Sequence, residues 1–170
     1  IFIEPSSDTT YLRAIDGTNR VAGQMQVGGS YHAMLWDDGV LTDLHDELKL
    51  TGGSAAWAFD LDGRVLISAL YTYFWYDSSD GSTETVHTFP SGSTLLRNRV
   101  ADNGTVGFSW IHGGIPHGGR WTTDGGFESI VIDKPAISFD INDINNAGHM
   151  TASSFTLPVY ERAALLWGDG

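Results

Sequence analysis

Four positions, each six residues before a recurring turn, carry polar or aromatic side chains that suit ligand binding. The turns lie at positions 19, 63, 104 and 148, and the residues are Arg13, Trp57, Asn98 and Asn142. Further charged side chains lie near them in the sequence: Arg97, Arg99, Asp140 and Asp143. Guanidinium, amide and carboxylate groups around an indole can hydrogen-bond and stack against a polyhydroxylated ligand. The pattern therefore predicts a binding site for a carbohydrate or another small polar ligand.

Two tryptophans, Trp57 and Trp110, do not follow the spacing that the other four keep. A residue that breaks a repeat needs a reason other than the repeated structure. We therefore expect these two indoles to provide stacking surfaces for a ligand. The alternative is that they fill irregular gaps between sheets. Trp110 also precedes a glycine-rich segment that contains His112 and His117.

A pair of aspartates suggests a second kind of function, that of an enzyme. Asp140 and Asp143, with Arg97 or Arg99 nearby, could act as general acid and base in a small enzyme of the cyclase or lyase type. The chain has no nucleophile elbow and no phosphate-binding glycine motif. We therefore expect a non-catalytic binding module, with the small enzyme and a protein-interaction scaffold as alternatives.

The metal-ligating residue types show no motif of known spacing. His32 and His117 each lie four residues before a tryptophan, which favours a structural role, and we expect no metal site. Two acidic stretches, Asp60–Gly63 and Asp140–Asn145, could offer oxygen ligands to Ca²⁺. Asp and Asn are also common in tight turns for conformational reasons. No cofactor is expected, and Ca²⁺ is the alternative.

Tryptophans that recur at a near-constant interval reveal the architecture that must position these residues. Trp36, Trp75, Trp121 and Trp167 are separated by 39, 46 and 46 residues, and a further 39 lead from Trp167 through the chain ends back to Trp36. An Asp-Gly or Gly-Asp-Gly sequence follows each tryptophan, which predicts type I′ hairpin turns. A period of this size that closes on itself predicts a β-propeller.

Each repeat fits four short strands, so the predicted fold is an all-β, four-bladed propeller with about 42 residues per blade. The innermost strands of a propeller line its central channel, so we expect the eight polar and aromatic residues to converge there and the ligand to bind at the channel or the loop face. The alternative is that the arginines and aspartates pair with one another across a closed channel. In the first repeat we expect strands at Tyr11–Asp16, Arg20–Val27, His32–Trp36 and Val40–Leu44. We prefer a strand to a short helix over Thr42–Leu50. The chain forms one domain, 1–170, with repeats at about 10–53, 54–92, 93–135, and 136–170 plus 1–9.

The fourth repeat lacks its last strand, and we expect Ile1–Glu4 to supply it and so to close the ring. The alternative is that this strand pairs between two chains. The protein is then either a monomer or a strand-swapped dimer.

The first repeat resembles the HAF repeat, a family of repeats expected outside the cell and named for a His-Ala-Phe triplet. The resemblance rests on Ala14–Asp16, Val21–Gly23, His32–Gly39 and Thr42–Leu44, and segments 143–149 and 163–167 of the fourth repeat are similar. It implies a propeller-like fold and an extracellular location, and it implies no particular activity.

Charge and composition narrow the range of partners. The formal net charge is −12, from 9 basic and 21 acidic residues, which excludes nucleic acid as a partner because its phosphates would be repelled. No run of 18 apolar residues occurs, so no membrane insertion is expected. The chain begins with Ile1, from which we expect that a leader or a larger polypeptide has been removed and that the protein is secreted. The expected partner is a small polar ligand or glycan, with a protein partner as the alternative.

Overall fold

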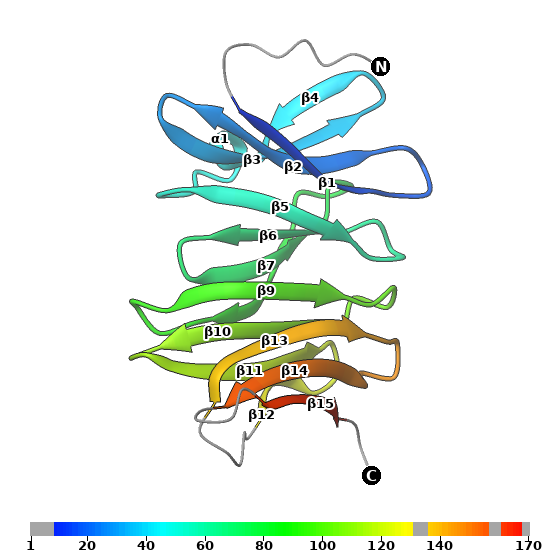
Figure 1. Cartoon of the computed structure of the whole chain (residues 1–170). Helices are drawn as coiled ribbons and strands as arrows, with labels where there is room; N and C mark the ends of the chain where they lie inside the picture. The colour runs from blue at the N-terminus through cyan, green and yellow to red at the C-terminus, as the bar shows by residue number, and fades with distance from the viewer. Residues whose placement is uncertain (1–8, 131–135, 157–160, 168–170) are drawn as a thin grey trace. The chain divides into compact units, whose positions relative to one another are not determined.

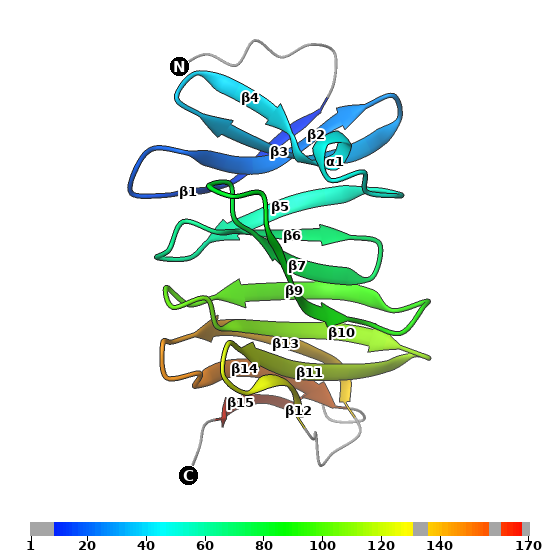
Figure 2. The ribbon, with the colours of Figure 1, turned by 180° about the vertical axis from the view of Figure 1, so that it is seen from behind.

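Antiparallel β-sheets make up nearly all of the computed structural model, which describes residues 9–130, 136–156 and 161–167 (Figures 1 and 2). The chain forms two compact units, Ile1–Thr88 and Phe89–Gly170, and each is described by itself. Among the described residues, no helix is both long enough and apolar enough to cross a membrane.

The first unit contains two four-stranded sheets, each with its strands in sequence order. The strands of the first sheet are β1 (Thr10–Ile15), β2 (Val21–Val27), β3 (Ser30–Asp37) and β4 (Val40–Asp43). Those of the second are β5 (Ser54–Phe59), β6 (Val65–Ala69), β7 (Thr72–Tyr76) and β8 (Thr83–Thr88). The four strands expected in the first repeat are confirmed to within two residues at each end.

The second unit contains a four-stranded and a three-stranded sheet, again in sequence order. The larger sheet comprises β9 (Thr94–Val100), β10 (Val106–His112), β11 (Ile115–Thr122) and β12 (Gly126–Ile130). The smaller comprises β13 (Ala136–Ile144), β14 (Met150–Thr156) and β15 (Glu161–Trp167). The expected closing strand Ile1–Glu4 lies outside the described residues, so closure of a four-bladed ring stays a prediction.

A short helix, α1 (Leu44–Glu47), follows β4, and the preference for a strand over Thr42–Leu50 was wrong from Leu44 onward. Asp43 caps this helix, because its Oδ1 accepts hydrogen bonds from the backbone N–H groups of His45 and Asp46. Leu44 is completely buried in the core of the first unit. The cap and this one apolar contact turn the chain away from the sheet.

Small residues let adjacent sheets pack closely in both units. Ala22 of β2 and Ala33 of β3 are fully buried against the β5–β8 sheet, in a cluster that includes Val65 and Ile67. The equivalent positions of the second unit are Gly107 of β10 and Gly118 of β11. A Cβ atom at Gly107 would meet Met150 and Ile141, and one at Gly118 would meet the ring of Phe139. In each unit, the face of the first sheet that packs against the second sheet therefore carries alanine or glycine at these positions. The small side chains let the two sheets approach closely.

Strand register separates Trp75 from the other repeating tryptophans. Trp36, Trp121 and Trp167 lie opposite Val21, Val106 and Met150, the first residues of their neighbouring strands. In the second sheet Tyr76 holds this position, opposite Val65, and Trp75 lies opposite Leu66. A shift of one residue moves a side chain to the other face of the sheet. The assignment of Trp75 to the repeat was therefore wrong by one residue, although the side chain is buried.

The hairpin predictions hold for the first sheet only. Asp38 and Gly39 have φ values of 44° and 87°, as a type I′ turn requires. In the second and third hairpins only Gly81 and Gly126 have positive φ, and the loops are not type I′ turns. The hairpin predicted at Gly168–Gly170 lies outside the described residues.

A five-residue turn joins the first two strands of every sheet, as the recurring turn positions predicted. The N–H of the first residue donates to the carbonyl of the fifth, at distances of 2.9–3.1 Å, in the turns 16–20, 60–64, 101–105 and 145–149. The fourth residue has positive φ in every case: Asn19, Gly63, Gly104 and Gly148. These turns fix where the first strand of each sheet (β1, β5, β9 and β13) ends.

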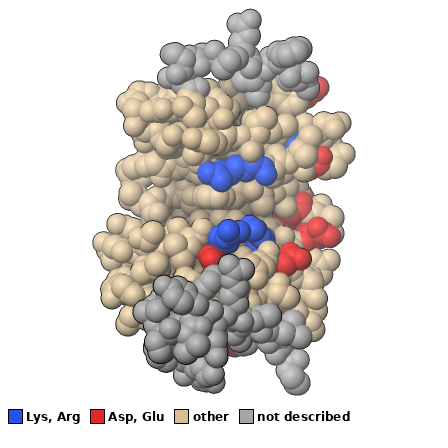
Figure 3. Space-filling view, in the orientation of Figure 1, with Lys and Arg blue, Asp and Glu red and all other residues tan. Residues whose placement is uncertain are grey.

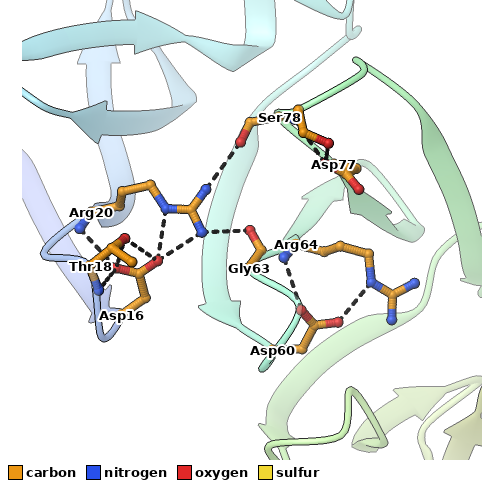
Figure 4. Close-up of polar contacts among 9 residues, drawn as sticks. Asp16, Thr18, Arg20, Asp60, Gly63, Arg64, Asp77 and Ser78 are labelled. Carbon is orange, nitrogen blue, oxygen red and sulfur yellow. Dashed lines mark hydrogen bonds and ion pairs between the residues drawn. The ribbon is translucent and has the colours of Figure 1, made fainter.

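Arginines brace the turns of the first unit (Figure 4). Arg20 donates from its backbone N and from Nε to Asp16, and Arg64 makes the same two bonds with Asp60. Arg20 also donates from Nη2 to the carbonyl of Gly63, at 2.8 Å. The turn of the first sheet is thereby tied to the turn of the second.

The Asp16 carboxylate predicts a pH dependence of stability. Burial raises its pKa, but hydrogen bonds from Arg20 and Thr18 outweigh burial and leave the pKa below its usual value of 3.8. A lowered folded-state pKa contributes stability that is present above the unfolded-state pKa and is lost as the pH falls through the folded-state pKa. In urea unfolding at pH 5 to 2, the difference between wild type and Asp16→Asn should therefore shrink below about pH 4. Parallel pH profiles for the two proteins would contradict this assignment.

Candidate functional site

Two of the predicted binding residues come together in the first unit. The guanidinium carbon of Arg13, on β1, lies 3.8 Å from the ring centroid of Trp57, on β5. Both residues occupy β-bulges, since the register shifts between Leu12 and Ala14 and again between Ala56 and Ala58. A bulge redirects the side chain of the extra residue. Bulges at equivalent positions of β1 and β5, the first strands of the two sheets, thus place the guanidinium of Arg13 on the ring of Trp57.

Hydrogen bonds hold both partners of this stack. Trp57 donates from Nε1 to Ser68 Oγ at 2.7 Å, and Arg13 donates from Nη2 to Gln24 Oε1 at 3.1 Å. Partial burial lowers the pKa of Arg13, while Tyr73 and Tyr11 act in the opposite direction. Arginine remains a cation at neutral pH under such shifts.

Exposed tyrosines extend this site, and the sequence reasoning missed them. The rings of Tyr11 and Tyr31 lie 5.9 Å apart, and their exposed fractions are 47% and 37%. Tyr11 lies directly opposite Gln24 in the β1–β2 ladder. We call the group Arg13, Trp57, Gln24, Tyr11 and Tyr31 the aromatic–arginine site. Only the strand register could have revealed it.

The predicted residues of the second unit also meet, but mainly with one another. Arg97 Nε lies 3.7 Å from Asp140 Oδ1, and Arg99 donates to the backbone carbonyls of Asn142 and Asn98 at 2.8 and 2.9 Å. Figure 3 shows basic side chains on one face of each unit, with acidic side chains beside those of the second. The guanidinium of Arg99 thus joins β9 to β13. Convergence of all eight predicted residues on one channel stays a prediction.

The proposed acid pair is divided between different partners. Asp140 pairs with Arg97, and Asp143 Oδ1 accepts a hydrogen bond from the N–H of Ile144 at 3.0 Å. Within the described part of the second unit, no contact joins the two carboxylates. A role of the two carboxylates as acid and base stays a prediction.

Trp110 belongs to the core of the second unit, not to a ligand-stacking surface. Its exposed fraction is 6%, and its ring packs against Phe89, Phe127 and His117. The ring of His117 stacks on it at 5.2 Å. His112, from the same glycine-rich segment, makes a 3.3 Å hydrogen bond with Ser93. The alternative interpretation, that this tryptophan fills a gap in the core, fits the structure.

Several of the oxygens on which the Ca²⁺ alternative relied are engaged within their own turns. Both Asp60 oxygens accept hydrogen bonds from Arg64. The side-chain oxygen of Asn145 accepts from the backbone N–H groups of Ala147 and His149. These oxygens serve the turns, whereas Asp62 of the first stretch is exposed, and Ca²⁺ binding stays an alternative.

An apolar groove lies on the first sheet, opposite the face that packs against β5–β8. Its lining includes Leu12, Val21, Met25, Trp36 and Leu41. Val21 and Met25 alternate along β2 with the buried Ala22, so they point to the other side. Leu12 and Leu41 are 62% and 45% exposed.

Comparisons with known proteins concern the fold. No protein-family model matches the chain. No curated protein matches it either. Among solved structures, virginiamycin B lyase from Staphylococcus aureus is similar with a TM-score of 0.56 and 13% identity, over 91% of this chain and 54% of that one. A streptogramin B lyase (11% identity, 91% and 53% covered) and TolB from Acinetobacter baumannii (11%, 92% and 43%) also give TM-scores of 0.56.

These neighbours are β-propeller proteins, and the likeness shows that this chain has an all-β propeller fold. The chain spans about half the length of the solved structures that it matches. At 11–13% identity, the likeness shows the fold alone.

Proposed function

We propose that the protein is a non-catalytic binding module for a carbohydrate or another small polar ligand, held at the aromatic–arginine site of the first unit. The observation that carries this proposal is the guanidinium of Arg13 placed 3.8 Å over the ring of Trp57. The stack holds the N–H donors of the guanidinium in place, and the exposed rings of Tyr11 and Tyr31 offer apolar surface.

Carbohydrates match such a surface because they present C–H groups on one face and hydroxyl groups around the rim. Aromatic side chains pack against the C–H face, and arginine and glutamine form hydrogen bonds with the hydroxyl groups. Stacking and the bond to Gln24 fix the guanidinium before a ligand arrives, which reduces the entropy lost on binding. The exposed rings of Tyr11 and Tyr31 supply further contact area.

Charge favours a ligand that also carries a carboxylate. In the first unit, Arg20 and Arg64 are engaged by Asp16 and Asp60, whereas the bond described for the Arg13 side chain goes to the neutral amide of Gln24. Among the described residues, no carboxylate is in contact with the Arg13 guanidinium, so this cation would be open to an anionic group on the ligand. Bidentate pairing with a carboxylate is among the strongest contacts that a guanidinium makes.

The enzyme alternative has no comparable support. The lyases among the similar structures lend it some support, but at 11–13% identity their likeness concerns the fold, and Asp140 and Asp143 are each held by a different partner. A protein-interaction scaffold is therefore the alternative that the experiment must distinguish.

A glycan array followed by tryptophan-fluorescence titration tests the proposal. We expect saturable binding to neutral or acidic oligosaccharides, weakened at least about tenfold by Trp57→Ala and by Arg13→Gln, because each removes a central contact. Lys49→Gln, which also removes one exposed positive charge, is the matched control and should bind as wild type. Circular dichroism should show that all variants fold.

Two results would count against the proposal. A blank array, with no change in the emission spectrum, would favour the scaffold. Binding that survives both Trp57→Ala and Arg13→Gln would place the ligand elsewhere on the molecule.

A further inference from the structure

We propose that His32, His45 and Asp46 of the first unit form a binding site for a divalent transition-metal ion of the Zn²⁺ class. Each residue offers one donor atom, and the three atoms all lie within 4.8 Å of one another. In a tetrahedral zinc site, metal–ligand distances near 2.1 Å place neighbouring donors about 3.4 Å apart. Rotation of the side chains, including rotation of the two rings out of their stacked arrangement, would close the donors around an ion.

The local fold brings these residues together from separate elements. His32 lies on β3, and His45 and Asp46 lie in α1, which begins directly after β4. Asp43 caps α1 through Oδ1, and its Oδ2 lies 2.8 Å from His32 Nδ1. The capping residue thus connects the helix with the strand that carries His32.

Both imidazole rings are oriented in the way that metal-binding histidines are. His32 Nδ1 bonds to the Asp43 carboxylate, and His45 Nδ1 lies 2.9 Å from Ser54 Oγ. Ser54 is 4% exposed and is itself fixed by the N–H of Ala33. Histidine ligands usually make such a bond with the nitrogen that does not bind the metal, and it orients the ring. The second nitrogen of each ring is then available to an ion.

The charges around the rings favour a bound cation. The two ring centroids are 3.9 Å apart with an angle of 23° between the planes, and the carboxylates of Asp43 and Asp46 lie beside the ring of His32. Asp46 Oδ1 lies 4.0 Å from His32 Nδ1, and the Asp46 side chain is 75% exposed. An ion can therefore enter from solvent and keep water in its remaining coordination positions.

The donor set selects the class of metal. Two imidazoles with one carboxylate suit Zn²⁺, Ni²⁺, Co²⁺ or Cu²⁺, whereas Ca²⁺ and Mg²⁺ prefer sites made of oxygen alone. This inference is independent of the proposed carbohydrate function, because none of its residues belongs to the aromatic–arginine site. Sequence spacing did not reveal it, because 12 residues separate the two histidines and they do not form a His-Glu-x-x-His arrangement.

Calorimetric titration of the whole chelator-treated chain with Zn²⁺, and separately with Ca²⁺, is the direct test. We expect one Zn²⁺ ion per chain, no comparable binding of Ca²⁺, and a rise in melting temperature with excess Zn²⁺. Asp46→Asn and His45→Gln should each weaken Zn²⁺ binding at least tenfold. With Co²⁺ in place of Zn²⁺, the visible absorption of the bound ion should fall in the same variants.

Controls separate this site from general attraction to an acidic surface. His149→Gln removes an exposed histidine of the second unit, and Asp38→Asn removes an exposed carboxylate of the first, and both should bind Zn²⁺ as wild type does. If His45→Gln fails to fold, Asp46→Asn decides the question, since that side chain is mostly exposed. No saturable Zn²⁺ binding, or unchanged affinity in Asp46→Asn, would overturn the proposal.

Discussion

Replacing Asp60 with alanine should lower the free energy of unfolding by about 3 kcal/mol, the lower end of the range for breaking a buried ion pair. The Asp60 side chain is 1% exposed and lies 2.7 Å from Arg64 Nε, and its other oxygen accepts from the backbone N–H of the same residue. The substitution leaves a largely buried guanidinium without its main partner. Glu84, which also contacts Arg64, is 47% exposed and would compensate only in part. Urea unfolding followed by circular dichroism measures the change.

Asp62→Ala in the same turn is the matched control, because Asp62 is exposed. It should change stability by less than about 0.5 kcal/mol, as surface substitutions commonly do. Combining Asp60→Ala with Arg64→Met should recover part of the loss, since the unpaired charge is then removed as well. An Asp60→Ala cost no larger than that of Asp62→Ala would show that the ion pair contributes little.

Gly118→Ala should destabilise the protein by about 2 kcal/mol through overpacking. The added Cβ atom would collide with the ring of Phe139, which is 1% exposed in the core between the two sheets of the second unit. The backbone of Gly118 does not require positive φ, so the cost would come from packing alone. Thermal or urea unfolding of the variant reports it directly.

Gly17→Ala provides the comparison for this prediction. A Cβ atom at Gly17 meets nothing within 4 Å, and its φ is not positive, so the substitution should be close to neutral. Adding Phe139→Leu to Gly118→Ala should cost less than the two single changes sum to, because the smaller side chain removes the collision. Strict additivity would contradict the proposed contact.

Local signals made much of the fold predictable from the sequence. The five-residue turns carry Gly or Asn at the one position that needs positive φ, so their recurrence located the sheets along the chain. The strand register was harder to predict. Tyr76 and Trp75 are adjacent aromatic residues, and only the ladder with Val65 and Leu66 shows which of them continues the repeat. The helix α1 was missed because one capping residue and one buried leucine outweighed the strand pattern.

The sequence also pointed to two residues of the candidate site and missed the others. Counting back from the turns singled out Arg13 and Trp57, which two bulges bring into contact, and their role in ligand binding stays a prediction. Trp57 was also singled out because it does not follow the tryptophan spacing. The same reasoning misplaced Trp110, whose irregular position reflects packing with Phe89 rather than exposure. The stacked His32 and His45 depend on contacts between a strand and a helix that no spacing rule encodes.

The connectivity of the sheets also bears on how the chain finds its structure. Each described strand pairs only with strands adjacent to it in sequence, so every ladder can form by closing a short loop. Folding is then expected to begin in individual hairpins and to spread to their neighbours, rather than to wait for a search between distant segments. The corresponding hazard is mistaken pairing between hairpins from different repeats, because their turns share one geometry. Differences among the repeats, such as glycine at 107 where the second sheet has Leu66, would help each hairpin to reject the wrong neighbour.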